Sequence, residues 1–270
     1  MATQAEKDQH RAQRAAHRAQ KRNEPVPETD PNGPIDCACV IHGNGYDWIY
    51  VDRLYNMLNR HLSRGARLHV YTEATRPIPG HFIRHDLEEW PGISGRKQSW
   101  WYKMQMFNPE HYRGQLLYFD LDTVIVNNID WITELSPVFF WTLQDFRSLW
   151  QPNLQKINSS VMYWNTQDWA SIWQEFNRQG AGKICTRYRQ GGDQEYLNTV
   201  IPRQKRMFFD SRRTVSWRWT ALDGGINTDN RTYLRPGQGT KIDPDTSVLV
   251  LHGDPKPHEI TDAVIKQHWR

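Results

Sequence analysis

The sequence predicts an α/β protein with a mostly parallel central sheet. From residue 35 onwards, apolar runs of strand length alternate with segments of helical periodicity, the pattern typical of strands joined by crossover helices. A chain of 270 residues with 38% hydrophobic residues can bury one large core. No apolar stretch approaches the ~18 residues of a membrane helix, so no transmembrane segment is expected.

Each expected element has its own signal. Strands are assigned to runs rich in Val, Ile, Leu and aromatic residues; they are Ile35 to His42, Leu68 to Thr72, a run starting at Phe82, Leu116 to Val126, Pro137 to Leu143, Val161 to Trp164, and Ser247 to Leu251. Helices are assigned where apolar residues recur every three or four positions; they are residues 47–63, Ser99 to Phe107, and a segment from Thr166 to Gly180. Together they predict one Rossmann-like domain with helices flanking the sheet.

The N-terminal 34 residues are predicted to lie outside the folded domain, which spans residues 35–270. Residues 1–22 carry six basic and two acidic residues, which equals the whole net charge of +4. Without an apolar face this segment is expected to be a solvated tail, followed by a Pro-rich linker. The absence of a signal-like apolar segment and an odd count of three cysteines favour the cytoplasm, with peripheral binding at a membrane surface as an option.

The most informative run, Leu116 to Val126, contains two charges, Asp120 and Asp122. On an extended chain, side chains two residues apart point the same way, so both carboxylates would face one spot. Two close carboxylates at the end of a buried strand favour a cation between them, and Mg²⁺ or Mn²⁺ carrying substrate phosphates fits. The alternative is a strand end where two acids meet water; spacing alone does not choose.

Other polar segments have both a chemical and an ordinary interpretation. His252 follows the last strand and can be a third metal ligand, and Lys256 can neutralise a phosphate, although both types are common on surfaces. Asn158 and its neighbours can bind a sugar hydroxyl or cap a strand, and Asp193 can be a helix N-cap. Residues 203–218 hold six basic residues against Asp210, and Trp217 and Trp219 close that stretch. It suits sugar, phosphate or nucleic-acid contact, or a packed surface.

In their order along the chain, these segments resemble the metal-dependent glycosyltransferases of family 8, the glycogenin and bacterial galactosyltransferase group. The resemblance runs from about Ile35 to Pro257 and rests on matching motifs. The motifs are the loop Val40-Ile41-His42-Gly43-Asn44-Gly45-Tyr46, Lys103 before the acidic strand, the Asp-x-Asp pair Asp120-Leu121-Asp122, Asn158-Ser159-Ser160-Val161 in place of Asn-Ser-Gly-Val, and Asp193-Gln194 before Leu197-Asn198. The family's closing His-x-x-Gly-x-x-Lys-Pro-Trp is shortened, because Gly253 directly follows His252 and His258 replaces Trp.

The resemblance implies an A-type glycosyltransferase fold and a metal-dependent, retaining transfer of a hexose or related sugar from a nucleotide-sugar donor, expected to be UDP-linked. It implies Mn²⁺ or Mg²⁺ on Asp120, Asp122 and His252, and catalytic roles for Asp193, Gln194 and Lys256. The donor-binding residues that it implies are His42, Gly43, Tyr46, Lys103, Asp120, Leu121, Asn158, Ser159, Gly253 and Lys256. Whether Asp193 or Gln194 is a nucleophile or only stabilises an oxocarbenium-like state stays open.

Two rival functions fit parts of the sequence. Haloacid-dehalogenase-type phosphatases also carry Asp-x-Asp after an apolar strand, but on the first strand of their domain. A non-catalytic sugar-binding module would have no need of a leaving-group metal. For the acceptor, the basic stretch Arg203 to Arg218 with Trp217 and Trp219 favours a glycan or another anionic acceptor, with modified DNA as the alternative.

Overall fold

The computed structural model describes residue 26 and residues 28–90, 93, 99–222 and 239–270. The predicted basic tail, residues 1–22, lies outside the described residues. The strands are β1 Ile35–Val40, β2 Ala66–Thr72, β3 Ile83–Asp86, β4 Gln115–Phe119, β5 Thr123–Ile125, β6 Phe140–Gln144, β7 Ile157–Asn165, β8 Arg206–Phe208, β9 Thr214–Ser216 and β10 Val248–Val250. The helices are α2 Ile49–His61, α3 Asp130–Thr133, α4 Ala170–Gln179, α5 Ala181–Arg187, α6 Gly192–Val200 and α7 Ala263–His268, with a 3-10 helix at Ser99–Phe107 and a π-helical turn at Trp217–Ala221.

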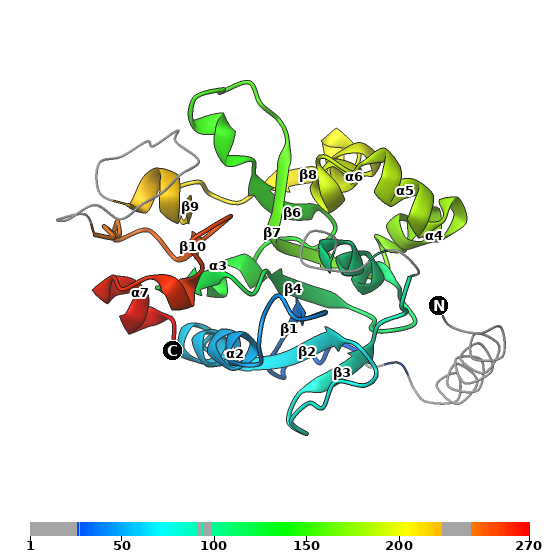
Figure 1. Ribbon diagram of the computed structural model, residues 1–270, viewed down its shortest axis with the longest axis horizontal. Helices are drawn as coiled ribbons and strands as arrows, with labels where there is room; N and C mark the ends of the chain where they lie inside the picture. The colour runs from blue at the N-terminus through cyan, green and yellow to red at the C-terminus, as the bar shows by residue number, and fades with distance from the viewer. Residues whose placement is uncertain (1–25, 27, 91–92, 94–98, 223–238) are drawn as a thin grey trace.

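A seven-stranded sheet in the order β3-β2-β1-β4-β7-β6-β8 forms the centre of the molecule (Figure 1). Strands β3, β2, β1 and β4 are parallel, and so are β6 and β8, whereas β7 is antiparallel to both of its neighbours. Strands β6 and β7 are consecutive and antiparallel without a crossover α-helix between them, which explains the reversal. The predicted mostly parallel α/β sheet is confirmed.

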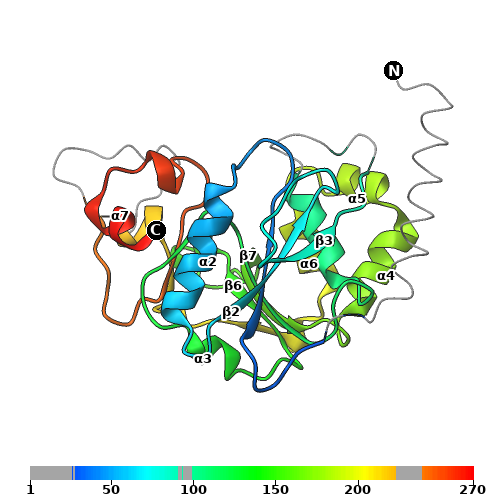
Figure 2. The same cartoon turned by 90° about the horizontal axis from the view of Figure 1, so that it is seen from below.

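Helices cover both faces of this sheet, with α2 on one side and α4, α5 and α6 on the other (Figure 2). Successive side chains of β1 point to opposite faces of the sheet. Cys37 and Cys39 belong to the core cluster that contains residues of α2, and Ala38 belongs to the cluster that contains residues of α4 to α6. Strands with both faces buried read as continuous apolar runs, which is why these were found from sequence. In the described part of the chain, no helix is both long and apolar enough to cross a bilayer.

The acidic run is not one strand, so that prediction was wrong. Strand β4 ends at Phe119, the chain turns through Asp120 to Asp122, and β5 then joins a second sheet of order β5-β10-β9. The turn is closed by the Thr123 amide, which donates to the Asp120 carbonyl at 3.1 Å. Local composition cannot reveal this break, because the residues on both sides of it are equally apolar and equally buried.

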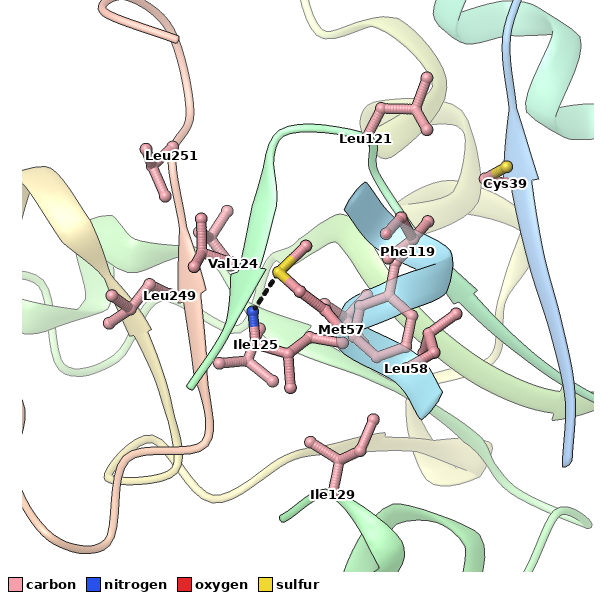
Figure 3. Close-up of a cluster of buried hydrophobic side chains, with 14 of the residues drawn as sticks. Cys39, Met57, Leu58, Phe119, Leu121, Val124, Ile125, Ile129, Leu249 and Leu251 are labelled. Atoms are coloured by element: carbon pink, nitrogen blue, oxygen red, sulfur yellow. Dashed lines mark hydrogen bonds between the residues drawn. The ribbon is translucent and has the colours of Figure 1, made fainter. Parts of the chain in front are cut away.

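The second sheet is held against the end of β4 by α2. Figure 3 shows Met57 of α2 lying between Phe119 on one side and Val124 and Ile125 on the other. The Met57 sulfur accepts a hydrogen bond from the Ile125 amide at 3.3 Å. This packing fixes the position of the acidic turn between the two sheets.

The described part of the predicted linker contacts the domain. The Thr29 amide donates to the Arg113 carbonyl at 3.1 Å, and the Arg67 guanidinium donates to the Glu28 carbonyl at 3.0 Å. Arg64 Nε donates to the Gly33 carbonyl at 2.9 Å. Residues 28–34 are thereby held on the edge of the fold before β1 begins.

A buried polar network lies behind that segment. Asp36 accepts from Arg67 Nε at 2.5 Å and from the Tyr112 hydroxyl at 2.5 Å, and it is hydrogen-bonded to His69 Nε2 at 2.9 Å. His69 Nδ1 in turn lies 2.8 Å from His85 Nε2. Burial acts to raise the pKa of Asp36, but the hydrogen bonds from His69, Arg67 and Tyr112 outweigh it and lower that pKa. Burial lowers the pKa of His69, against the opposing effect of Asp36.

We expect His69→Gln to reduce the pH dependence of stability. Because the folded-state pKa of His69 is lowered, the unfolded chain binds the proton first, so this group's contribution to stability is lost as the pH falls through ~6.5. Replacing it should reduce the slope of the free energy of unfolding between pH 7 and 5 by up to about 1.4 kcal/mol per pH unit. Urea denaturation at several pH values measures this slope.

The matched control is His81→Gln, which removes an exposed imidazole and should change the free energy of unfolding at pH 7 by less than about 0.5 kcal/mol. An unchanged slope in the His69 variant would contradict the neutral, buried state of this imidazole.

Candidate active site

Asp122 lies where three segments that are distant in sequence meet. The Tyr46 hydroxyl, from the loop after β1, donates to Asp122 Oδ2 at 2.9 Å. The ammonium of Lys256, from the segment after β10, forms an ion pair with the same oxygen and lies 5.5 Å from the centre of the Tyr46 ring. The first loop and the closing segment are therefore joined at the acidic turn.

Asp120 faces a second lysine. Lys103, on the 3-10 helix Ser99–Phe107, places its ammonium 2.7 Å from Asp120 Oδ1, and the Tyr118 hydroxyl donates to that oxygen at 2.5 Å. The same ammonium lies 3.4 Å from Asp193 Oδ2 and 3.4 Å from Ser159 Oγ. Tyr118 and Asp120 are two residues apart at the end of β4, so the period of a strand would have revealed this missed partner.

Asp193 and Gln194 are fixed by the start of β7. Ser159 Oγ donates to Asp193 Oδ2 at 2.6 Å, and the Ser159 amide donates to Gln194 Oε1 at 2.9 Å. The α6 N-cap residue is Gly191, so the interpretation of Asp193 as a helix cap was wrong. Its carboxylate points instead to the lysine that also binds Asp120, and Asn158 turns its own Oδ1 to the Ser160 amide at 2.9 Å.

Negative charge exceeds positive charge in this cluster. Three carboxylates, Asp120, Asp122 and Asp193, face two ammonium groups, Lys103 and Lys256. Burial raises the pKa of Asp122, Lys256 opposes the rise, and the charge of Asp120 adds to it. Burial likewise raises the pKa of Asp193, against the opposing effect of Lys103. Burial alone would lower the pKa of Lys103, but Asp120 and Asp193 outweigh it and raise that pKa.

This excess charge fits a cation, although the structure does not gather a three-residue ligand set. Across the described ranges, no group of three or more His, Cys, Asp and Glu side chains is close enough to hold a metal ion. His252 directly follows Leu251, and the Leu251 amide donates to the Asp122 carbonyl at 3.3 Å. The His252 Nε2, however, lies 2.8 Å from Ser216 Oγ. Burial and the charge of Arg218 lower the pKa of His252 to about 4, so its imidazole is neutral at pH 7. Two carboxylates and a neutral imidazole are suitable ligand types for Mn²⁺ or Mg²⁺.

The remaining predicted donor residues have other neighbours in the structure. His42 Nε2 is 3.1 Å from Glu89 Oε1, and its ring stacks on Tyr102 with centres 3.8 Å apart. The Gly43 amide donates to Glu73 Oε1, and its φ of 67° is one that glycine adopts readily. Leu121 is buried in the apolar core. Gly253 has a φ of 78°, which favours glycine, and a Cβ there would approach the Arg218 guanidinium to 3.0 Å.

The basic stretch 203–218 is not a surface of arginines and aromatic rings. Trp217 is buried and donates to Thr240 Oγ1 at 2.8 Å, and Trp219 packs on Trp150 and His252. Arg206 is buried and donates to the Ile201 carbonyl at 2.9 Å. Of the two interpretations of this stretch, both tryptophans fit the packed one; exposed cations of this stretch are Arg203, Lys205 and Arg212.

Comparisons with known proteins identify the fold. No family model matches the chain, and no curated protein matches its sequence. Among solved structures, an active-site mutant of LgtC gives a TM-score of 0.62 at 14% identity, covering 86% of this chain and 93% of that one. Galactosyltransferase LgtC with donor and acceptor sugar analogues gives 0.61 at 14% identity, covering 86% and 93%. GlyE from Streptococcus pneumoniae TIGR4 gives 0.56 at 14% identity, covering 87% and 60%.

The chain therefore has the A-type glycosyltransferase fold, as the motifs led us to expect. The acidic pair follows the fourth strand along the chain rather than the first, which is the position expected of a glycosyltransferase and not of a haloacid-dehalogenase-type phosphatase.

We expect Lys103→Met to destabilise the fold more at pH 7 than at pH 5. Removing this ammonium leaves the buried carboxylate of Asp193 and the partly buried carboxylate of Asp120 without their shared cation, at a cost of about 3 kcal/mol when they are ionised. Because the folded-state pKa of Asp193 is already raised and would rise further, protonation relieves the cost as the pH falls. Chemical denaturation of both proteins at the two pH values measures the difference.

Lys156→Met is the matched control, since Lys156 pairs with Glu195 at 3.0 Å with both side chains well exposed, and its loss should cost less than about 1 kcal/mol. An equal penalty at pH 5 and pH 7 for the Lys103 variant would show that these carboxylates do not depend on Lys103 for their charge.

Proposed function

We propose that the protein is a metal-dependent, retaining glycosyltransferase that moves a hexose or related sugar from a UDP-sugar to an acceptor hydroxyl. The observation that carries the proposal is the convergence of Tyr46 and Lys256 on Asp122, beside Lys103 on Asp120. This arrangement places an aromatic ring, two ammonium groups and two carboxylates at the carboxyl end of β4. In open α/β sheets, ligands bind at such ends of strands.

The proposal assigns the leaving diphosphate to Lys256. An ammonium group beside a breaking glycosidic bond stabilises the negative charge that develops on the diphosphate. Lys256 now pairs with Asp122 and would exchange part of that interaction for the donor's phosphate. The Tyr46 ring, fixed by its hydroxyl on Asp122 and packed edge-on to Tyr50 with centres 4.7 Å apart, would lie against the base.

The residues that would hold the metal are Asp120 and Asp122, with His252 as the third ligand. When bound, a divalent cation supplies positive charge to the diphosphate of the donor. The excess of one carboxylate over the two lysines supports this assignment. The neutral His252 supports it as well, because only the unprotonated imidazole binds metals.

Lys103, Ser159 and Asp193 would surround the transferred sugar. The ammonium of Lys103 and the Ser159 hydroxyl hold Asp193 in one orientation, and the Ser159 amide holds Gln194. Groups that are fixed before substrate binds are suited to stabilising an oxocarbenium-like state. Either Asp193 or Gln194 would face the anomeric carbon, as a nucleophile or as a stabilising group.

We expect Asp122→Ala to abolish hydrolysis of UDP-sugar donors. The wild-type protein should hydrolyse a UDP-sugar from a donor panel in the presence of Mn²⁺ and lose that activity in EDTA, because the diphosphate would leave without its compensating charge. The variant should lose at least about a hundredfold in rate, the size of loss that follows removal of one electrostatic group in comparable sites. Product analysis by mass spectrometry reads out the nucleotide and the sugar together.

The control is Asp168→Ala, which removes an exposed carboxylate outside the cluster and should keep the wild-type rate. Turnover that persists in EDTA, or an active Asp122 variant, would overturn the proposal. Tight UDP binding by calorimetry without turnover of any donor would instead indicate a non-catalytic sugar-binding module.

A further inference from the structure

A large cavity of the described structure lies beside the candidate active site. It has a volume of ≈ 1140 Å³ and is bounded by the segment after β6, the start of β7, the end of α5 and the first turn of α6. These elements lie together at one end of the sheet (Figure 1). Ligand pockets in proteins range over ~300–1,000 Å³, so this cavity exceeds the size needed for one monosaccharide.

The cavity shares a wall with the cluster of Lys103, Asp120 and Asp193. Gln194 lines the cavity, and its Oε1 accepts from the Ser159 amide. The hydroxyl of that serine donates to Asp193. Gln194 therefore links the cavity lining to the proposed sugar site.

The charges that line the cavity are mainly positive. Four basic side chains, Arg147, Lys156, Arg187 and Arg189, face two acids. Arg147 pairs with one acid, Asp145, at 2.5 Å, and Lys156 pairs with Glu195 at 3.0 Å. Arg187 and Arg189 form no ion pair with any residue in the described ranges, and both are exposed. Their guanidinium groups are free to bind an anion, for which their planar donors are well suited.

Two more features favour a polar, sugar-like occupant. Tyr188 lies between the two arginines and lines the same cavity, where its ring can stack on a pyranose. Gly191, the N-cap of the nine-residue helix α6, also lines the cavity and adds the partial positive charge of a helix N-terminus.

We propose that this cavity is the acceptor site and that it recognises a glycan bearing a carboxylate or phosphate group, held by Arg187 and Arg189. The proposal rests on the proposed glycosyltransferase function and assigns the anionic acceptor to this cavity instead of residues 203–218. A nucleic-acid interface, even of a single module, spreads over ~600–1,000 Å² of protein surface. One concave cavity therefore fits a glycan better than it fits DNA.

Calorimetric titration with matched probes tests the proposal. The probes are trigalacturonate, its neutral methyl ester, glucose 6-phosphate and glucose. We expect the wild-type protein to bind at least one anionic probe about tenfold or more tightly than its neutral partner at low salt. Arg187→Ala/Arg189→Ala should abolish that preference and leave binding of the neutral probe unchanged. A preference for trigalacturonate assigns the anion as a carboxylate, and a preference for glucose 6-phosphate assigns it as a phosphate.

Arg203→Ala/Lys205→Ala is the matched control, since it removes two exposed cations of the other basic stretch and should keep the preference. Loss of the preference in this control, equal binding of charged and neutral probes, or no binding of any probe would overturn the assignment. So would an oligonucleotide that binds more tightly than every glycan and depends on the same two arginines. Because binding is measured without a donor, a failure of donor hydrolysis alone would count against the proposed function and not against the cavity.

Discussion

The need to balance buried negative charge at the end of β4 determines how the active-site region is assembled. Asp120 and Asp122 come from the acidic turn and Asp193 from α6, and an ammonium group beside each carboxylate offsets its charge. Lys103 joins the end of β4 to the start of α6, and Lys256 joins the closing segment to the acidic turn. The order of the strands in the sheet and the packing of the two core clusters bring these five side chains together.

Much of the central sheet could be predicted from the sequence, because its strands are buried on both faces and read as continuous apolar runs. The prediction fails where the pairing of strands that are distant in sequence determines the structure. Strands β8 and β9 have three residues each and lack a local signal. The break at Asp120 is likewise invisible locally, since β4 and β5 are both mainly apolar and buried although they join different sheets. Pairing partners, rather than propensity, determine these features.

The sequence indicated which residues belong to the candidate site, and the structure shows which of them contact one another. The acidic pair, Lys103, Asp193 and Lys256 were selected from motif order, and they do form one cluster. The basic stretch was misleading, because composition cannot tell a buried tryptophan from an exposed one. Arg187 and Arg189 attracted no attention in the sequence, since two arginines flanking a tyrosine are ordinary until a cavity is seen beside them.

The acidic turn also connects the two sheets, and this position bears on which metal ion the proposed site would select. Asp120 directly follows a strand of the large sheet and Asp122 directly precedes a strand of the small one, so the packing of the two sheets affects how the turn that carries both carboxylates is held. The side chain of Met57 lies in that packing layer. In the proposed metal site, selection between cations of different ionic radius would then depend on an apolar layer behind the ligands, which substitutions can change without altering either aspartate.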